Sequence, residues 1–126
     1  QKLLPAMQRG TSIVFISSLG ARIPSPRYAG LGIGKALAEA LIRYLVMELA
    51  PLGIRINAVA PGPVPTQNFQ ESTGISEEQV PAMEKNLGIP LQRFGKVEDI
   101  GAAVVFIASP AASWITGQCL YVTGGM

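Results

Sequence analysis

Short apolar runs alternate along the chain with longer stretches in which apolar residues recur every three or four positions. Ser12 to Ser18 is a continuous apolar run with β-branched residues, which is typical of a strand buried on both faces of a parallel sheet. Arg55 to Ala60 and Gln118 to Thr123 have the same character and predict two further short strands. The pattern therefore predicts three strands separated by helical segments.

Helical spacing is found in three segments. Gln1 to Gln8 predicts the last turns of a helix, and Arg27 to Leu49 predicts a long helix that Pro51 and Gly53 terminate. Val97 to Ser109 predicts a buried helix, with four apolar residues on one side: Val97, Ile100, Val104 and Ile107.

Two segments between these elements stand out by composition. Pro61 to Thr66 holds three prolines in five residues, which excludes regular structure and predicts a rigid loop. Asn68 to Gly88 holds four of the eight acidic residues, and Ser76 with Glu77 looks like the start of a short helix. We expect a mobile substrate lid over about residues 67 to 90.

The order of these elements predicts an α/β fold with a parallel sheet and helices on both faces. The chain, residues 1 to 126, is too short for more than one domain. Three strands make only part of a doubly wound sheet.

Composition excludes several classes of protein. Hydrophobic residues make up 48% of the chain and charged residues 14%, with a mean hydropathy of +0.35, so a disordered chain is excluded. The net charge of +2 comes from scattered basic residues, which disfavours nucleic acid and anionic membranes as partners.

Metal chemistry and membrane insertion are also disfavoured. With no His and one Cys, Cys119, the chain lacks the usual metal ligands and cannot form an internal disulfide, so we expect no metal and a cytoplasmic location. The longest apolar stretch, Ile100 to Ala108, is far shorter than the roughly 20 residues of a membrane helix.

The glycines at 30, 32 and 34 do not form a nucleotide-binding motif. A dinucleotide fingerprint would need glycine where Lys35 stands, and a phosphate loop would need glycine at Ala29. Gly30, Gly34 and Ala38 are better explained by the close packing of a cofactor or a neighbouring chain against the helix.

Tyr28, Lys35 and Ser18 are the candidate catalytic residues. Positions seven apart on a helix differ by only about 20° in direction, so Tyr28 and Lys35 share a face. A nearby ammonium stabilises a phenolate, and Ser18 adds a hydroxyl at the carboxyl end of the first strand, where ligands bind in open α/β sheets. Taken singly, each residue also fits a structural role as a rim tyrosine, a solvated lysine or a strand-end serine.

Several motifs together make the chain resemble the short-chain dehydrogenase/reductase family. They are Ile16-Ser17-Ser18, the helix with Tyr and Lys, Ile56-Asn57-Ala58-Val59-Ala60-Pro61-Gly62 with Thr66, Arg93-Phe94-Gly95 with Glu98-Asp99, Ile115-Thr116-Gly117-Gln118, and Gly124-Gly125. The resemblance implies the carboxyl-terminal half of a Rossmann-like domain, with the last three strands and their flanking helices.

Two positions depart from the family pattern. The family places Tyr four residues before Lys, where this chain has Leu31, and Thr123 replaces the Asp of a final Asp-Gly-Gly. A Tyr seven residues before the Lys instead resembles the enoyl-acyl-carrier-protein reductases of the superfamily. There the charge appears on the thioester oxygen, three bonds from the carbon that accepts hydride, so the stabilising hydroxyl must lie further from the nicotinamide.

The resemblance also implies the remaining site. NADPH or NADH would be the cofactor, with Lys35 on the nicotinamide ribose, Pro61 and Gly62 along the nicotinamide, the Val64 backbone at the carboxamide, and Thr66 at the pyrophosphate. The substrate would be an acyl thioester of acyl carrier protein or CoA, in fatty-acid or polyketide synthesis.

Two other functions remain open from the sequence. The protein could be a carbonyl reductase or alcohol dehydrogenase of the same fold, such as a 3-oxoacyl-thioester reductase, or a non-catalytic fragment.

We expect a homotetramer, because the long helix carries more apolar surface than one sheet face covers. We also expect these 126 residues alone to be inactive and to aggregate or bind a complementary chain.

Overall fold

The computed structural model describes residues 4–86 and 88–126. Its strands form one parallel sheet in the order β1 (Ser12–Ile16), β2 (Arg55–Pro61), β3 (Cys119–Val122). The predicted α/β class and parallel sheet are therefore confirmed. In the first predicted helix, Gln1 to Leu3 lie outside the described residues, and Leu4–Ala6 form a single 3₁₀ turn.

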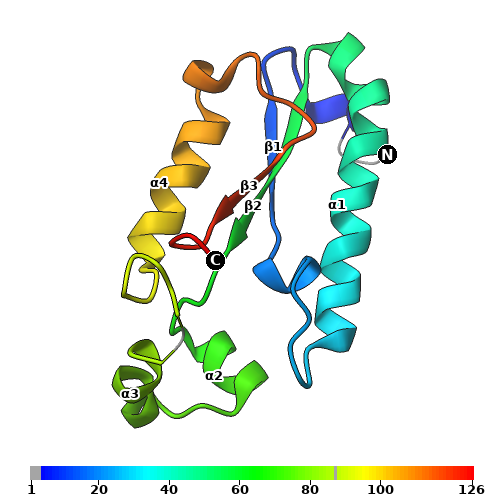
Figure 1. The fold of residues 1–126 in the computed structure, drawn as a ribbon. Helices are drawn as coiled ribbons and strands as arrows, with labels where there is room; N and C mark the ends of the chain where they lie inside the picture. Colours follow the sequence, from blue (N-terminus) through cyan, green and yellow to red (C-terminus); the bar gives the residue numbers. More distant parts are fainter. Residues whose placement is uncertain (1–3, 87) are drawn as a thin grey trace.

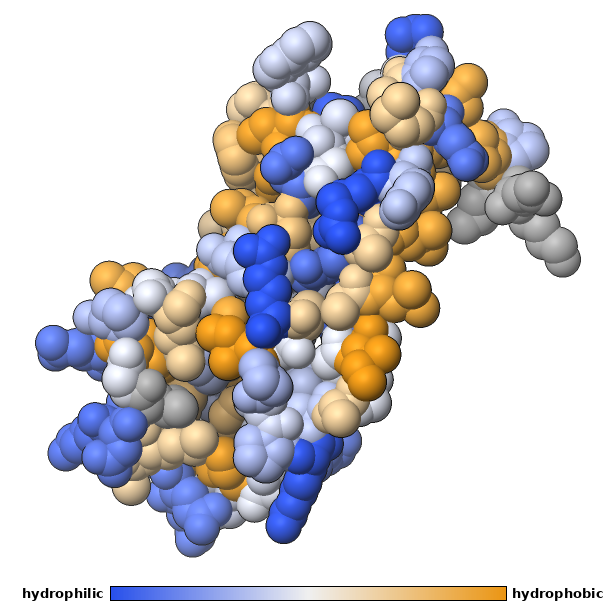
Figure 2. Space-filling model, turned by 45° about the vertical axis from the view of Figure 1, so that its right-hand side comes forward, coloured by the Kyte–Doolittle hydropathy of each residue, from blue (hydrophilic) through white to orange (hydrophobic). Residues whose placement is uncertain are grey.

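Two long helices cover opposite faces of the sheet (Figure 1). Helix α1 (Ala29–Leu49) packs on β2 from one side, and α4 (Val97–Ala108) contacts all three strands from the other. In Figure 2, hydrophobic residues form a broken band on the side where α1 lies, with hydrophilic residues between them.

The predicted lid contains two short helices, α2 (Gln67–Thr73) and α3 (Val80–Glu84), near the carboxyl ends of the strands (Figure 1). Thr66 caps α2 by accepting a hydrogen bond from the Phe69 N–H, and Gly74 ends it in a left-handed conformation. The sequence analysis missed α2 because its seven residues are mostly polar and carry no helical apolar pattern. The helical start predicted at Ser76 is confirmed as a 3₁₀ turn over Glu77–Gln79.

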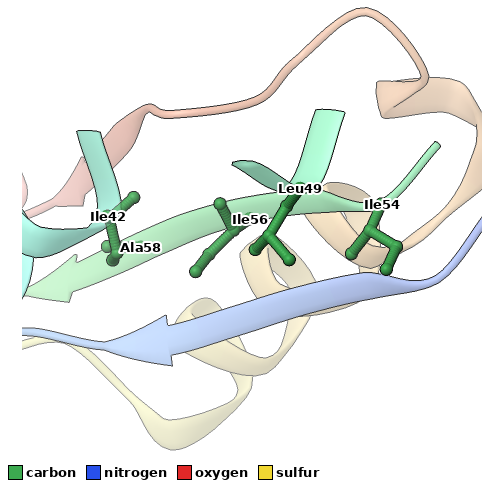
Figure 3. Close-up of a cluster of buried hydrophobic side chains, with 5 residues drawn as sticks. All are labelled: Ile42, Leu49, Ile54, Ile56 and Ala58. Carbon is green, nitrogen blue, oxygen red and sulfur yellow. The ribbon is translucent and has the colours of Figure 1, made fainter. Parts of the chain in front are cut away.

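The main core lies between α1 and β2. Figure 3 shows that Ile42 and Leu49 point from α1 toward β2, against Ile56 and Ala58, with Ile54 just before the strand. All five are at most 5% exposed. Alternation along β2 places residues 54, 56 and 58 on the same face, under the helix.

Two burial predictions are wrong. β1 is not buried on both faces: its residues are partly exposed, Ile16 to 43%, because β1 is an edge strand that pairs only with β2 among the described residues. In α4, only Ile107 of the four predicted core residues is buried, and Val97 is 62% exposed. The side chains of Val97, Ile100 and Val104 line an open cavity instead of packed core.

Charged side chains hold both ends of α4. At its start, Asp99 pairs with Arg93 at 2.6 Å and accepts a hydrogen bond from the Lys96 N–H. The hydrogen bond from Arg93, followed by that from Lys96, lowers the pKa of Asp99 to about 2. At its end, the Arg55 guanidinium donates to the carbonyls of Ile107, Ala108 and Ser109. The Ile107 and Ala108 carbonyls have no partner within α4, so this β2 residue ties the end of α4 to the sheet.

Asn57 is a fully buried polar side chain in the central strand. Its Nδ2 donates to the Ile115 carbonyl at 2.9 Å, and its Oδ1 accepts from the Gln118 N–H at 3.0 Å. Both partners lie in the turn that leads into β3, so Asn57 fixes where that strand begins.

Asn57→Leu is expected to lower the free energy of unfolding by about 2 kcal/mol, because at nearly constant volume it removes both hydrogen bonds of a fully buried side chain and leaves the Gln118 N–H without its partner. Urea denaturation of the protein measures this loss. Asn86→Leu is the matched control, since Asn86 is exposed and its side chain makes one hydrogen bond within the described residues, to the Ala82 carbonyl. An equal loss in both variants would contradict the assigned role of Asn57.

Candidate active site

The strands end at one edge of the sheet, and a cavity of about 620 Å³ opens there. It is lined by the end of β1, the start of α1, the loop after β2, α2 and one side of α4. All seven residues that the sequence analysis selected line it: Ser18, Tyr28, Lys35, Pro61, Gly62, Val64 and Thr66. The fold therefore brings together residues that lie up to 48 positions apart in the sequence (66 − 18).

The side chains of Tyr28 and Ser18 are hydrogen-bonded to each other. The Tyr28 hydroxyl donates to Ser18 Oγ at 3.0 Å, and the Gly20 N–H donates to the same oxygen at 3.1 Å. Ser18 thus accepts two hydrogen bonds and keeps its own hydroxyl hydrogen for another acceptor. Tyr28 stands just before α1, with its carbonyl bonded to the Gly32 N–H, so the helical geometry already extends to it.

Two glycines make room for the Tyr28 ring, and the sequence analysis did not identify them. A Cβ on Gly20 would lie 2.4 Å from Tyr28 Cε1, and a Cβ on Gly32 would lie 2.6 Å from the Gly20 carbonyl oxygen. The stack of Gly32, Gly20 and Tyr28 is therefore possible only without side chains at the two glycines. By contrast, Gly30 and Gly34 face open space, so of the three helix glycines only Gly32 is needed for close packing within the described chain.

Lys35 reaches the same edge from the next turns of α1. Its ammonium donates to the Ile16 carbonyl at 2.7 Å and lies 4.9 Å from the centre of the Phe15 ring. One of its three hydrogens is used in the carbonyl bond, which leaves two for a ligand. Tyr28 and Lys35 thus face one cavity, as their spacing on the helix predicts, and each is tied to the end of β1.

The proline-rich loop presents a backbone donor to the cavity. Pro61, Pro63 and Pro65 have no N–H, the Gly62 N–H donates to the Val122 carbonyl, and the Thr66 N–H donates to the Val64 carbonyl. The Val64 N–H has no hydrogen-bond partner within residues 4–86 and 88–126. Thr66 Oγ1 accepts from the Phe69 N–H, so its hydroxyl hydrogen remains available.

A second cavity, of about 210 Å³, lies on another side of Tyr28. Ser18, Tyr28 and Phe69 line both cavities, and the second is otherwise mostly apolar, with Ile23 and Met83 in its wall. Phe69 and Met83 come from α2 and α3, so the predicted lid does border the site. The sequence analysis named no lid residue, because nothing in its spacing marks Phe69 as facing inward.

Two kinds of site are not found. In the described part of the chain, no group of three or more Cys, Asp and Glu residues is arranged to hold a metal ion. None of the helices in residues 4–86 and 88–126 combines the length and apolar character needed to cross a membrane.

A protein-family profile described as "Enoyl-(Acyl carrier protein) reductase" matches residues 1–126. The chain is 40% identical over its full length to the short-chain dehydrogenase/reductase SDRA of Arabidopsis thaliana, of which it covers 48%. It is 40% identical, over 91% of its length, to the peroxisomal 2,4-dienoyl-CoA reductase of Saccharomyces cerevisiae, of which it covers 38%. Relatives named for other substrates match as well, among them the glucose 1-dehydrogenase of Gluconobacter oxydans, at 40% identity over 94% of this chain and 43% of that protein.

Solved structures agree with these relatives. The Bacillus cereus enoyl-acyl carrier protein reductase, crystallised with NADP⁺, superposes with a TM-score of 0.81 at 30% identity, over 96% of this chain and 46% of that one. The chain thus spans less than half the length of each of these relatives.

Gly20→Ala is expected to push the Tyr28 ring aside and break its bond to Ser18, because the new methyl group and the ring cannot occupy the same space. A crystal structure of the variant should show the Tyr28 Oη to Ser18 Oγ distance well beyond its present 3.0 Å. Gly34→Ala, where nothing lies within 4 Å, is the control and should keep that distance. An undisturbed Tyr28 in Gly20→Ala would refute the packing argument.

Proposed function

The chain belongs to the short-chain dehydrogenase/reductase superfamily, and from that premise we propose that its protein is an NAD(P)H-dependent reductase of the C=C bond of an enoyl thioester. In this proposal the 126 residues supply the last three strands of a Rossmann-type domain. The family profile and relatives that act on enoyl or dienoyl thioesters support the substrate class.

The observation that carries the proposal is the position of the one phenol bonded to Ser18. Tyr28 stands seven residues before Lys35, and the position four before Lys35 is Leu31, which lines the large cavity. In ketone reduction, the proton donor must reach the oxygen on the same carbon that takes the hydride. In an enoyl thioester the hydride adds to the β-carbon, the C=C electron pair moves toward the carbonyl, and the negative charge appears on the thioester oxygen. A phenol displaced along the helix suits the second geometry.

Each hydroxyl then has a distinct task. Tyr28 releases Ser18 and donates to the thioester oxygen as the charge develops there, and a proton later adds to the α-carbon to complete the saturated product. Ser18 can turn its spare hydroxyl hydrogen toward Tyr28 Oη and so hold the phenol in place. Lys35 adds a positive charge at the same edge.

The residues at the large cavity fit a nicotinamide cofactor. The unpaired Val64 N–H suits a carboxamide oxygen, the two free Lys35 hydrogens suit ribose hydroxyls, and the Thr66 hydroxyl hydrogen suits a phosphate oxygen. When bound, the reduced nicotinamide would supply the hydride. The apolar cavity of about 210 Å³ on another side of Tyr28 would then receive the acyl chain.

The outer face of α1 suits a second copy of the chain. Ile33, Leu37, Leu41, Tyr44 and Met47 follow each other at three- and four-residue spacing and are 54% to 78% exposed. Such a continuous apolar stripe on a soluble protein is typical of an interface. We propose a homotetramer built partly on this stripe, located in the cytoplasm and serving fatty-acid biosynthesis.

Tyr28→Phe is expected to lower kcat for a crotonyl thioester by about 10²-fold or more, because the enolate oxygen loses its donor, with NADPH affinity nearly unchanged. The loss of NADH or NADPH absorbance measures the rate in the whole protein, and fluorescence titration measures cofactor binding. An unchanged kcat would remove Tyr28 from the reaction.

An acetoacetyl thioester offered in parallel tests the alternative. A protein that reduces the ketone and leaves the crotonyl thioester intact is a carbonyl reductase, and the proposed substrate is then wrong. In Leu31→Tyr the phenol returns to the position four before Lys35, and we expect ketone reduction to rise relative to wild type.

Leu37→Glu combined with Leu41→Glu is expected to reduce the oligomer to smaller species, because two carboxylates would be buried in an apolar contact. Light scattering at micromolar concentration measures the mass. The paired control is Glu77→Gln with Glu78→Gln, which changes exposed charge away from α1. A wild-type mass equal to the monomer would overturn the proposed assembly.

A further inference from the structure

Glu39 is a buried carboxylate that the proposed reaction does not use. It is 7% exposed and lies one helical turn after Lys35 on α1. An ionised side chain at such a position is costly unless several donors satisfy it. The described residues around it supply three neutral donors and no salt bridge.

The three donors come from both outer strands of the sheet. Ser17, just after β1, donates its hydroxyl to Glu39 Oε1. Tyr121 in β3 donates to Oε2 at 2.9 Å, and the Cys119 thiol lies 3.4 Å from Oε1. The carboxylate therefore links the two edge strands above the central one.

The sequence of β2 makes this arrangement possible. Ala58 and Ala60 are paired with Cys119 and Tyr121 in register, and the Ser17 N–H bonds to the Val59 carbonyl. Alternation places the side chains of residues 17, 58, 60, 119 and 121 on the face that α1 covers. The two alanines leave space under the helix that a larger side chain would fill.

The donors are fixed in their protonated forms. Burial, followed by the nearby Glu39 carboxylate, raises the pKa of the Cys119 thiol to about 11. Burial and the hydrogen bond to Glu39 also raise the pKa of the Tyr121 phenol above its ordinary value. The Arg22 guanidinium lies 4.2 Å from the centre of the Tyr121 ring and adds a contact that holds the ring in place. At neutral pH all three groups thus keep the hydrogens that they donate.

Ser17 connects this cluster to the proposed catalytic pair. It is 4% exposed and immediately precedes Ser18, whose oxygen accepts the Tyr28 hydroxyl hydrogen. Ile16, on its other side, gives its carbonyl to Lys35. The backbone that leads to Ser18 is therefore tied to α1 at two successive residues, by Lys35 at the Ile16 carbonyl and by Glu39 at the Ser17 hydroxyl.

We propose that Glu39 is a positioning residue that holds Ser17, and through it the Ser18 and Tyr28 hydroxyls, in the geometry for reaction. The inference rests on the proposed roles of Ser18 and Tyr28. It requires no contact between Glu39 and substrate. It predicts that kcat depends on a hydrogen-bond acceptor at position 39 more than on a negative charge there.

Four variants of the whole protein test this. Glu39→Met keeps the volume but removes the acceptor, and kcat should fall about 10-fold or more with the KM for cofactor nearly unchanged, since small misplacements of reacting groups are costly. Glu39→Gln should restore kcat to within about 3-fold of wild type, because its carbonyl oxygen can accept from Ser17 while its NH₂ donates to Tyr121 Oη. Ser17→Ala should reproduce the loss seen in Glu39→Met, and the double variant should lose no more than either single one.

Tyr121→Phe is the matched control, because it removes a donor from the same carboxylate but leaves the Ser17 bond intact. Its kcat should stay near wild type. A loss as large as that of Glu39→Met would show that the cluster acts through general stability and would overturn the proposal. Additive losses for Ser17→Ala and Glu39→Met would overturn it too.

A readout without substrate separates this proposal from the proposed function. With ¹³C-labelled tyrosine rings, the Tyr28 resonance should shift in Ser17→Ala and Glu39→Met and keep its wild-type position in Glu39→Gln, although neither side chain is hydrogen-bonded to Tyr28. Tyr44, 76% exposed, is the internal reference. If the Tyr28 resonance does not move, the proposal fails even in an active enzyme. If it moves in a protein that leaves enoyl thioesters unreduced, the positioning role stands and only the substrate is wrong.

Discussion

Everything at the site depends on how the end of β1 is tied to α1. Three successive residues each make one hydrogen bond to α1 or to the residue just before it: the Ile16 carbonyl accepts from Lys35, the Ser17 hydroxyl donates to Glu39, and Ser18 Oγ accepts from Tyr28. Tyr28, Lys35 and Glu39 can do this because helical spacing puts them on one face. An extended segment turns successive side chains to opposite sides, so Ser17 can point under the helix while Ser18 points to the cavity. The buried hydroxyl of Ser17 and the cavity-lining hydroxyl of Ser18 thus belong to adjacent residues.

The helix that carries these groups meets conflicting demands along its length. Toward β2 it needs large apolar residues such as Ile42 and Leu49. Toward the end of β1 it needs Lys35 and Glu39, and at its first turns it must approach the Gly20 backbone so closely that only Gly32 fits. Glycine costs a helix up to about 1 kcal/mol relative to alanine. The packing of the long core stretch from Ile42 onward offsets that cost, and the glycine-rich end of the helix is the end that borders the cavity.

The sequence was informative where periodicity is strong and uninformative where contacts are long-range. The three strands, both long helices and the cavity-lining positions of Tyr28, Lys35 and Thr66 follow from local patterns and from the family resemblance. Burial of β1 and α4 was predicted wrongly, because an apolar strand looks the same at an edge as in the centre of a sheet. Glu39 could not be found at all: at a helical position it looks like any solvated glutamate, and two of its three partners, Cys119 and Tyr121, lie 80 and 82 residues away in the sequence.

The glycines show the same limit more sharply. Gly30, Gly32 and Gly34 are indistinguishable by spacing, yet only Gly32 has a backbone atom within reach of an added Cβ. The decisive neighbour, the Gly20 carbonyl, is itself fixed by the turn that follows Ser18, whose oxygen accepts the Gly20 N–H. That same turn brings Gly20 under the Tyr28 ring. Gly32 looks like part of a failed nucleotide motif, but it is required because the Gly20 backbone lies directly against it, under the Tyr28 ring. Ser18 links Gly20 to the ring, since its oxygen accepts hydrogen bonds from both the Gly20 N–H and the Tyr28 hydroxyl.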